Sequence, residues 1–276
     1  MNPHSQYPYS LTAMWLSVYR NKSLIWQMIK REIAGSFRGS FLGVMWLFLQ
    51  PLIMLCVYTF VFCFVLKTTW RGNPESGTMS FAIILFAGLT VHTLFAECIN
   101  RAPTLILGNT NLVKRVVFPL EVLPIVTIGV AFFNFLVSLL ILFGAMLLSG
   151  HDFHLTLFYT PLVIFPLFFM TLGITWIMSS TGVYLRDLGH AAVLITTILL
   201  FLSPVLFPME LIPEQFRNLI YLNPLTFIIN QVRAVMLWGQ PPDWFWLTVY
   251  SAVGVLVAWL GFCFFQYTRK GFCDVL

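Results

Sequence analysis

Acidic and histidine side chains are the groups in this sequence that could carry acid–base, metal or group-transfer chemistry, and they are few. The 276 residues include ten Asp and Glu and five His. Among the acids, the candidates for such chemistry are Asp152, Glu210, Glu214 and Asp243. They form no DxD or other paired motif of the kind that joins a general acid to its base. For His92, His154 and His190 we expect hydrogen-bonded structural roles.

Motifs of the common hydrolases are absent from the sequence. It contains no GxxxxGK[ST] phosphate loop, no HExxH and no nucleophile elbow. The chain is therefore not expected to hydrolyse ATP by the phosphate-loop route. Its five cysteines, at positions 56, 63, 98, 263 and 273, have no metal-ligand spacing. We expect no catalytic residue, no metal and no cofactor in this chain.

The charged residues leave six long apolar segments between them. Each runs for more than about 20 residues without Asp, Glu, Lys or Arg, enough to cross a hydrocarbon core of roughly 30 Å as a helix. Composition agrees, since 59% of the residues are hydrophobic and only 9% are charged. The sequence predicts one all-α polytopic membrane domain over 1–276. Its six transmembrane helices span about 41–66, 79–100, 121–149, 157–184, 189–208 and 244–268.

Basic residues divide unequally between the two sides of the membrane. With a cytoplasmic N-terminus, eleven of the fifteen Lys and Arg lie inside, and only Lys67, Arg71, Arg217 and Arg233 lie outside. This bias predicts that both termini and the 101–121 link are cytoplasmic. Because the basic residues follow the membrane sides and form no soluble patch, we exclude nucleic acid as a partner despite the net charge of +5.

The N-terminal segment 9–36 is amphipathic. Apolar residues repeat at helical spacing at Ile25, Met28, Ile29 and Ile33, and polar residues take the other face. We expect one helix that lies on the cytoplasmic surface of the membrane. Further along, Glu97 and Arg101 are four residues apart, and we expect them to neutralise each other at the inner membrane edge.

The segment 210–242 is outside by the charge count yet strongly apolar. Asn223-Pro224 divides it into two helical pieces, 213–222 and 225–238, each too short to span. We expect a re-entrant helical hairpin in the outer half of the membrane, between the fifth and sixth spans. The charges of Glu210, Glu214, Arg217 and Arg233 should stay near the outer surface.

Four ordered motifs give the chain a family resemblance that covers about residues 28–270. The segment from Phe37 to Pro51 is similar to the start of the membrane subunits of ABC-type polysaccharide exporters. The segment from Asn109 to Pro119 resembles their first cytoplasmic coupling segment, and Tyr184-Leu-Arg-Asp187 resembles the second. The stretches 202–208 and 222–226 resemble their outer gate region. O-antigen exporters are the most similar, with capsule and teichoic-acid exporters next.

The resemblance implies a half-transporter that is not itself an enzyme. Two copies would pair in the bacterial inner membrane, above two copies of a separate nucleotide-binding ATPase that holds ATP and Mg²⁺. The cargo would be a polysaccharide attached to a polyprenyl diphosphate lipid, with O-antigen of lipopolysaccharide as the first expectation. The remaining partner would be membrane lipid.

The resemblance also implies residue roles. The residues expected to receive the ATPase stroke are Asn109, Asn111, Leu112, Lys114, Arg115, Arg186 and Asp187. The basic residues suited to a lipid diphosphate at the cytoplasmic entrance are Lys30, Arg31 and Arg38. The residues expected in the outer gate are Pro208, Asn223, Pro224, Ile228 and Val232.

Aromatic residues crowd the end of the first span, at Tyr58, Phe60, Phe62 and Phe64. Such residues usually face lipid or pack against neighbouring helices. In a sugar exporter they could instead line the substrate path and stack on the apolar faces of sugar rings. Tyr58 and Phe62 share one helix face by their i, i+4 spacing, so we expect that pair to face the path.

Other functions stay open at this point. A permease of the same fold could export a capsule or teichoic polymer, or a small lipid or drug. A membrane-embedded glycosyl or lipid transferase would use the outer acids named above. A proton-coupled carrier would be expected to have more buried ionisable groups than this sequence offers.

Overall fold

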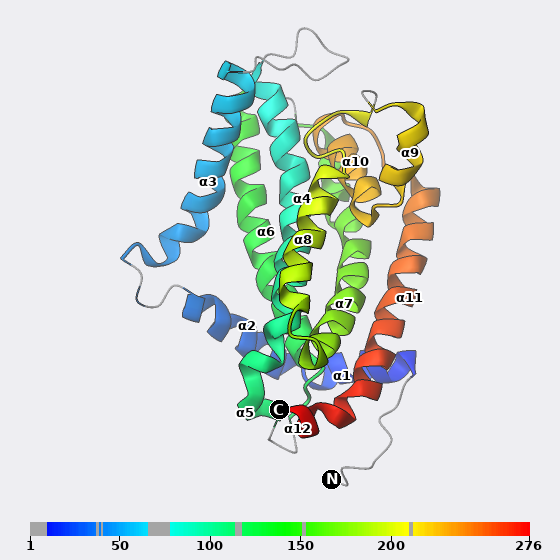
Figure 1. Ribbon diagram of the computed structural model, residues 1–276. Helices are drawn as coiled ribbons and strands as arrows, with labels where there is room; N and C mark the ends of the chain where they lie inside the picture. Colours follow the sequence, from blue (N-terminus) through cyan, green and yellow to red (C-terminus); the bar gives the residue numbers. More distant parts are fainter. Residues whose placement is uncertain are drawn as a thin grey trace.

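A bundle of long helices makes up the molecule (Figure 1). The structure, a computed structural model, describes residues 10–36, 39, 41–65, 78–113, 118–150, 153–209 and 212–276. Several residues with expected roles lie outside these ranges, namely Arg38, Lys114, Arg115, Asp152 and Glu210. The helices of the bundle are α3 (Trp46–Tyr58), α4 (Thr78–Leu105), α6 (Val122–Leu148), α7 (Thr160–Tyr184), α8 (Leu188–Phe201) and α11 (Trp244–Thr268).

Shorter helices complete the two ends. At the lower end in Figure 1, α1 (Leu11–Arg20) and α2 (Lys22–Ser36) lie across the bundle. The same end holds η3 (Leu107–Asn109), α5 (Thr110–Val113), η6 (Arg269–Gly271) and α12 (Phe272–Val275). At the upper end lie α9 (Glu214–Tyr221) and α10 (Pro224–Leu237). Two 3₁₀ turns, η1 (Gly43–Met45) and η4 (Leu155–Tyr159), lead into α3 and α7, and a π-helical turn, η2 (Thr59–Val65), extends α3.

Five helices in the described part of the chain are long and apolar enough to cross a membrane. They cover Gly43–Phe62, Phe81–Leu105, Val122–Leu148, Leu155–Tyr184 and Trp244–Gly271. These correspond to five of the six predicted spans. The second predicted span ended at residue 100, whereas the helix continues to Leu105, because Ala102 and Leu105 are buried in the bundle.

The predicted continuous helix over 189–208 is wrong in length. Helix α8 ends at Phe201 after 14 residues, and non-helical turns follow through residue 208. Pro204 disfavours helical backbone at Ser203 and lacks the N–H that would continue the helix. The Leu202 N–H closes the last turn by donating to the Ile198 carbonyl. The fifth predicted span is therefore a short helix followed by irregular chain.

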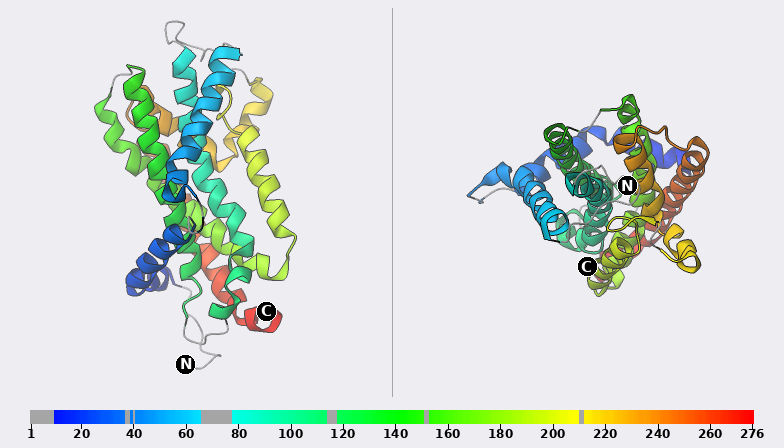
Figure 2. Two further views of the ribbon diagram at one scale, coloured as in Figure 1. Left: turned by 90° about the vertical axis from the view of Figure 1, so that its left-hand side faces the viewer. Right: turned by 90° about the horizontal axis from the view of Figure 1, so that it is seen from above.

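Helix α4 is the centre of the bundle, and α3 lies at its edge (Figure 2). Most side chains in the apolar part of α4 are buried, while few of those in Gly43–Phe62 are. Around α4 pack α6, α7, α8 and α10, and these helices share one hydrophobic core. The exposed side chains of α3 are large and apolar, so this helix meets lipid or another protein surface.

The predicted amphipathic helix over 9–36 is two helices that meet at Asn21. The Asn21 side-chain amide donates to the Ser17 carbonyl at 2.8 Å, and its backbone N–H donates to the same oxygen, which ends α1. Ile25 and Met28 are buried, and Ile29 packs where Gly129 of α6 leaves room for it. The apolar face of α2 is therefore covered by protein at Ile25, Met28 and Ile29.

Helices α7 and α11 approach each other unusually closely. A Cβ at Gly173 would collide with the backbone of Val257, and a Cβ at Gly261 would collide with the backbone of Gly173. A Cβ at Gly254 would lie 3.0 Å from the Pro166 carbonyl oxygen. Small residues at helix interfaces let backbones approach in this way, which is a common basis of helix association in membranes.

Candidate functional site

Two connections between long helices meet at the lower end of the bundle (Figure 1). One is η3 with α5, which follows α4, and the other is the turn between α7 and α8. Their helices are packed together, because a Cβ at Gly182 of α7 would collide with the backbone of Pro103 in α4. A Cβ at Gly189 would lie 4.0 Å from Cγ2 of Thr104. The helices that lead into and out of the two predicted coupling segments are therefore in contact at this end of the bundle.

The predicted coupling residues differ in their exposure to solvent. Asn111, Arg186 and Asp187 are exposed. Leu112 is half-buried against the lower core cluster that includes Met14 and Phe265. The Asn109 side chain donates to the Leu105 carbonyl at 2.9 Å, so it helps to end α4. Lys114 and Arg115 lie outside the described residues.

Glu121 is the centre of a polar cluster that the sequence analysis missed. Its carboxylate accepts hydrogen bonds from Ser17 Oγ at 3.0 Å and from Arg269 Nη1 at 2.6 Å. Its backbone carbonyl accepts from Trp176 Nε1 at 3.1 Å. Arg269 also donates from Nη2 to the Phe118 carbonyl at 2.8 Å. The Glu121 and Arg269 side chains are only 11% and 12% exposed, so this ion pair is poorly screened.

This Glu121 cluster connects α1, α7 and the end of α11 to the start of α6. The 101–121 link ends at the same point. One sequence signal could have indicated the pair. Both residues flank apolar spans, and the charge count places them on the same side of the membrane. Sequence separation of 148 residues conceals the contact, since only the packing of α6 beside α7 and α11 brings them together.

Replacing Glu121 with glutamine should destabilise this end of the molecule. The change keeps an oxygen for Ser17 but leaves Arg269 without its carboxylate, and breaking a buried ion pair typically costs about 3–5 kcal/mol. We expect a clearly lower unfolding temperature for the purified protein in detergent. Glu214→Gln is the matched control, because the Glu214 side chain is 91% exposed. Equal unfolding temperatures for Glu121→Gln and the wild type would contradict the role of the cluster.

Two of the three basic residues expected at the cytoplasmic entrance, Lys30 and Arg31, belong to α2, and Arg38 lies outside the described residues. Lys30 and Arg31 are exposed, and Lys30 Nζ lies 4.9 Å from the centre of the Trp26 ring. The expected pairing of Glu97 with Arg101 is wrong. Arg101 pairs instead with Glu32 of α2, which fixes the surface helix to α4. The α2 surface therefore offers two exposed cationic side chains, Lys30 and Arg31, next to the Arg101–Glu32 contact.

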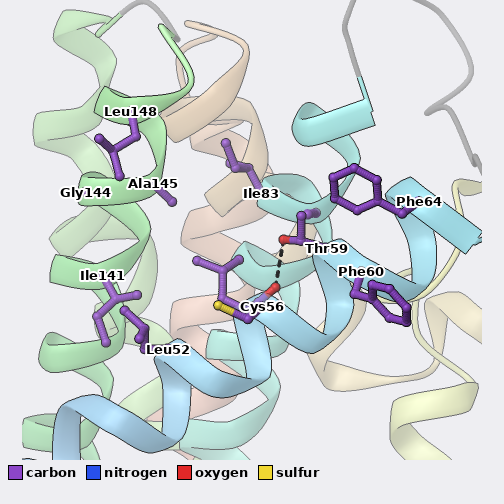
Figure 3. Close-up of a pocket in the computed structure, with 12 residues that line it drawn as sticks. Leu52, Cys56, Thr59, Phe60, Phe64, Ile83, Ile141, Gly144, Ala145 and Leu148 are labelled. Carbon is purple, nitrogen blue, oxygen red and sulfur yellow. Dashed lines mark hydrogen bonds between the residues drawn. The ribbon is translucent and has the colours of Figure 1, made fainter.

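An apolar groove of about 440 Å³ lies between α3 with η2 and α6, with α4 at its floor (Figure 3). Phe60 and Phe64 line it and are 61% and 70% exposed. Tyr58 and Phe62 are packed against the protein core, and the Phe62 ring lies 5.4 Å from that of Phe81. Tyr58 and Phe62, the pair that the sequence favoured for the substrate path, thus lie on the inward face of this segment. Because both pairs have i, i+4 spacing, the pattern alone could not show which one faces outward.

The outer apolar segment is two helices, α9 and α10, broken at Asn223 as expected. Asn223 Oδ1 accepts from the Leu225 N–H at 2.9 Å and so caps α10. Asn223 Nδ2 donates to the carbonyls of Leu199 and Leu202 at the end of α8, at 2.9 and 3.0 Å. Tyr250 donates to the Pro224 carbonyl at 3.0 Å. Tyr250 is six residues from the start of α11, so the helix break at Asn223-Pro224 lies about 9 Å along α11 from its first residue.

Arg233 of α10 does not lie at the surface, where the sequence placed the outer charges. It is fully buried and donates from Nε to the Ile84 carbonyl at 3.0 Å and from Nη2 to the Val205 carbonyl at 2.9 Å. Nη1 donates to the Pro204 carbonyl. Gly88 leaves room for the guanidinium, because a Cβ there would lie 2.7 Å from Nη2. Arg233 therefore fixes α10 to α4 and to the chain that follows α8.

The other residues expected in the outer gate are also inside the protein. Ile228 and Val232 are 0% and 1% exposed in the core formed with α4, and Pro208 is buried as well. Of the four outer acids that could serve a transferase, Asp152 and Glu210 lie outside the described residues, and Asp243 and Glu214 have structural partners. Asp243 caps α11 by accepting from the Trp246 N–H at 3.2 Å, and Glu214 lies 3.7 Å from Arg217. Among the described residues no group of three His, Cys, Asp or Glu could hold a metal.

Comparison with known proteins agrees with this arrangement. Residues 23–237 match the ABC-2 type transporter family. The chain is 28% identical over 261 residues to the O-antigen export system permease protein RfbA of Myxococcus xanthus, covering 93% of this chain and 96% of that protein. It is 22% identical to the RfbA protein of Klebsiella pneumoniae, with 89% and 92% covered. It is 24% identical to the polysialic acid transport protein KpsM of Escherichia coli, with 87% and 91% covered.

Proposed function

This chain belongs to the ABC-2 type transporter family, and on that premise we propose that it is the permease half of an ATP-driven polysaccharide exporter. Its cargo is a polyprenyl-diphosphate-linked polysaccharide, O-antigen of lipopolysaccharide first, carried across the bacterial inner membrane. The proposal is supported by relatives that are named for O-antigen export and polysialic acid transport. Both termini are cytoplasmic in this proposal, as the distribution of basic residues predicts.

The observation that carries the proposal is the packing of the end of α4 against Gly182 and Gly189, which brings the described residues 107–113 and the turn between α7 and α8 to the same end of the bundle. Asn111, Arg186 and Asp187 are exposed there, so a soluble protein can contact them. That partner is a separate ATPase, present in two copies, which holds ATP and Mg²⁺. The Glu121 cluster and the Pro103–Gly182 contact lie at the same end of the bundle and give it a rigid support.

A wide route for a polymer requires a second copy of the chain. The bundle is closely packed around α4, whereas α3 exposes large apolar side chains along most of its length. In our proposal α3 contributes to the boundary between two copies. Phe60 and Phe64, rather than Tyr58 and Phe62, offer flat apolar rings to the sugar. Lys30 and Arg31 on α2 attract the diphosphate at the cytoplasmic entrance.

The proposed topology has six crossings, with the outer segment as a re-entrant hairpin. Helix α8 accounts for about 21 Å at 1.5 Å per residue, and the irregular chain through residue 208 completes the crossing. Helices α9 and α10 enter the outer half of the membrane and turn at Asn223-Pro224. Backbone groups at Ile220, Pro224 and Leu225 near the turn are paired with protein side chains, and a re-entrant segment requires such pairing. The hairpin of each copy closes the outer mouth at rest.

Charge reversal at the α7–α8 turn tests the coupling directly. In the variant Arg186→Glu with Asp187→Arg, like charges should face the ATPase, and both co-purification and stimulated ATP turnover should fall about tenfold, a change equivalent to about 1.4 kcal/mol. The permease should remain in the membrane at its normal amount, because both side chains are exposed. Arg217→Glu on the outer helix α9 is the control.

Two outcomes decide this test. Normal co-purification together with normal turnover in the variant would assign Arg186 and Asp187 to a solvated turn and remove the main support for the proposal. Export is measured separately, as surface polysaccharide in a strain that lacks its own O-antigen permease. Failure of the wild-type chain to restore any polymer, with its cognate ATPase present, would reject this class of cargo.

A further inference from the structure

Helix α4 carries a stripe of polar side chains on its inner half. They lie on the face of this half that the rest of the protein leaves partly exposed. Thr93, Glu97, Asn100 and Thr104 follow i, i+4, i+7, i+11 spacing, so they lie on one side of the helix. Thr93 and Thr104 are exposed, and Glu97 and Asn100 are half-buried, although most of α4 is buried. We call these four residues the α4 polar stripe.

The part of the polar stripe from Thr93 to Asn100 lies within the depth of the membrane, and Thr104 lies just beyond it at the inner surface. Arg101 of α4 pairs with Glu32 of the surface helix α2, which marks the level of the inner membrane surface. Glu97 is one turn deeper, about 6 Å along the helix, and Thr93 about 12 Å. Thr93 is also the midpoint of the apolar span Phe81–Leu105. Carboxylate, amide and hydroxyl groups are therefore presented at hydrocarbon depth.

Neighbouring helices hold the stripe in position from both sides. Asn134 of α6 donates to both carboxylate oxygens of Glu97, at 2.8 and 3.0 Å. On the other side, Thr196 of α8 donates to Asn100 Oδ1 at 3.0 Å, and its carbonyl oxygen lies 3.0 Å from His92 Nε2. Figure 2 shows the lower half of α4 between α3 and α8 with no described helix in front of it. The stripe is thus fixed in place and open to its surroundings.

Open polar groups at this depth are not compatible with contact to acyl chains. An ionisable residue inside a membrane almost always faces protein or a water-filled cavity. We propose that the α4 polar stripe is the inner wall of a water-filled route, and that it binds the hydroxyl groups of a sugar chain. This inference rests on the proposed function for the identity of the cargo, but the water-filled route does not depend on it.

The chemistry of the stripe suits a hydroxyl-rich ligand. A threonine hydroxyl and an asparagine amide can each donate and accept, and a carboxylate accepts. Sugar hydroxyls also do both, so they can exchange partners along the row of four residues without leaving any group unpaired. No cationic side chain belongs to the stripe, which favours a neutral chain over the diphosphate. The diphosphate is expected at Lys30 and Arg31 instead.

Thiol accessibility tests the water-filled route. The five native cysteines are replaced by alanine, and Thr93→Cys or Thr104→Cys is introduced into the full permease, co-expressed with its ATPase in everted membrane vesicles. A charged, membrane-impermeant thiol reagent should label both at least about tenfold faster than Leu256→Cys, because a charged reagent is excluded from hydrocarbon. Leu256 is the control, since it is 50% exposed at the middle of α11.

Two labelling results would overturn the proposal. Labelling of Thr93→Cys at the rate of Leu256→Cys would place the stripe against lipid or sealed protein. Efficient disulfide formation between two Thr93→Cys copies under mild oxidation would identify the stripe as a contact between permease copies. Neither result depends on what the cargo is, so both are distinguishable from failure of the export function.

Export measurements test the contact with sugar. Thr93→Leu and Asn100→Leu should lower surface polysaccharide at least about tenfold at normal protein level and normal ATP turnover, whereas Thr93→Ser should keep export because it keeps the hydroxyl. Thr248→Leu is the matched control at an exposed threonine of α11. Normal export by Thr93→Leu and Asn100→Leu, in a strain where the wild type exports, would overturn the binding role.

Discussion

The variant Arg233→Met should lose export and unfold at a much lower temperature than the wild type. Methionine fits a buried apolar site, but it cannot donate to the carbonyls of Ile84, Pro204 and Val205. Hydrogen bonds to charged groups contribute about 1.5–3 kcal/mol each, and buried carbonyls left unpaired add to the cost. A total loss of about 4 kcal/mol or more should lower the unfolding temperature by roughly 10 °C in detergent.

Two further variants make this prediction specific. Gly88→Ala keeps all three donors but places a methyl group against the guanidinium, so it should reproduce part of the loss. Arg217→Met removes an arginine from α9 whose acidic partner, Glu214, is exposed. This change should alter the free energy of unfolding by less than about 1 kcal/mol. An Arg233→Met protein that unfolds at the wild-type temperature would show that the three carbonyls are not held by this side chain.

The second large effect is expected for Gly261→Leu. Any side chain at this position collides with the backbone of Gly173, which no rotamer change can avoid. Overpacking of a core typically costs about 1–3 kcal/mol even where side chains can adjust, so a backbone collision should separate α7 from α11. We expect little intact protein in the membrane, measured by detergent extraction and size-exclusion chromatography.

Gly144→Leu is the matched control for the Gly261 prediction. Gly144 is also within a membrane-spanning helix, α6, but no atom lies within 4 Å of the position that its Cβ would take. The control protein should accumulate normally. If Gly261→Leu accumulates as well as Gly144→Leu, the close approach of α7 and α11 is not present in the folded protein.

The apolar spans and the broken outer segment could be predicted because they follow from local sequence. Runs without charge are long only where the chain must lie in hydrocarbon, and Asn223-Pro224 both caps and breaks a helix on its own. The predicted pieces 213–222 and 225–238 differ by one residue at each end from α9 and α10. The early end of α8 was missed because apolar composition continues past Pro204 although the helix does not.

The contacts between distant segments could not be predicted from the sequence. Whether Arg233 faces water or carbonyls depends on the path of the non-helical chain after α8, and residues 202–208 carry no charge that would indicate this contact. The choice between the Tyr58 face and the Phe60 face depends on where α4 packs. The same holds for Glu121 with Arg269, and for Arg101, which has Glu97 four residues away but pairs with Glu32. Tertiary packing decides each of these, and periodicity does not.

The hydrogen bonds at the end of α8 have a mechanical consequence. Asn223 and Arg233 hold the carbonyls of Leu199, Leu202 and Val205, so the outer end of α8 and the α9–α10 pair form one stiff body. The opposite end of α8 begins directly after Arg186 and Asp187. In the proposed exporter, a displacement that the ATPase applies at this turn would therefore be transmitted through the 14 residues of α8 to the α9–α10 pair. The short helix α8 would then act as a lever between the two ends of the bundle.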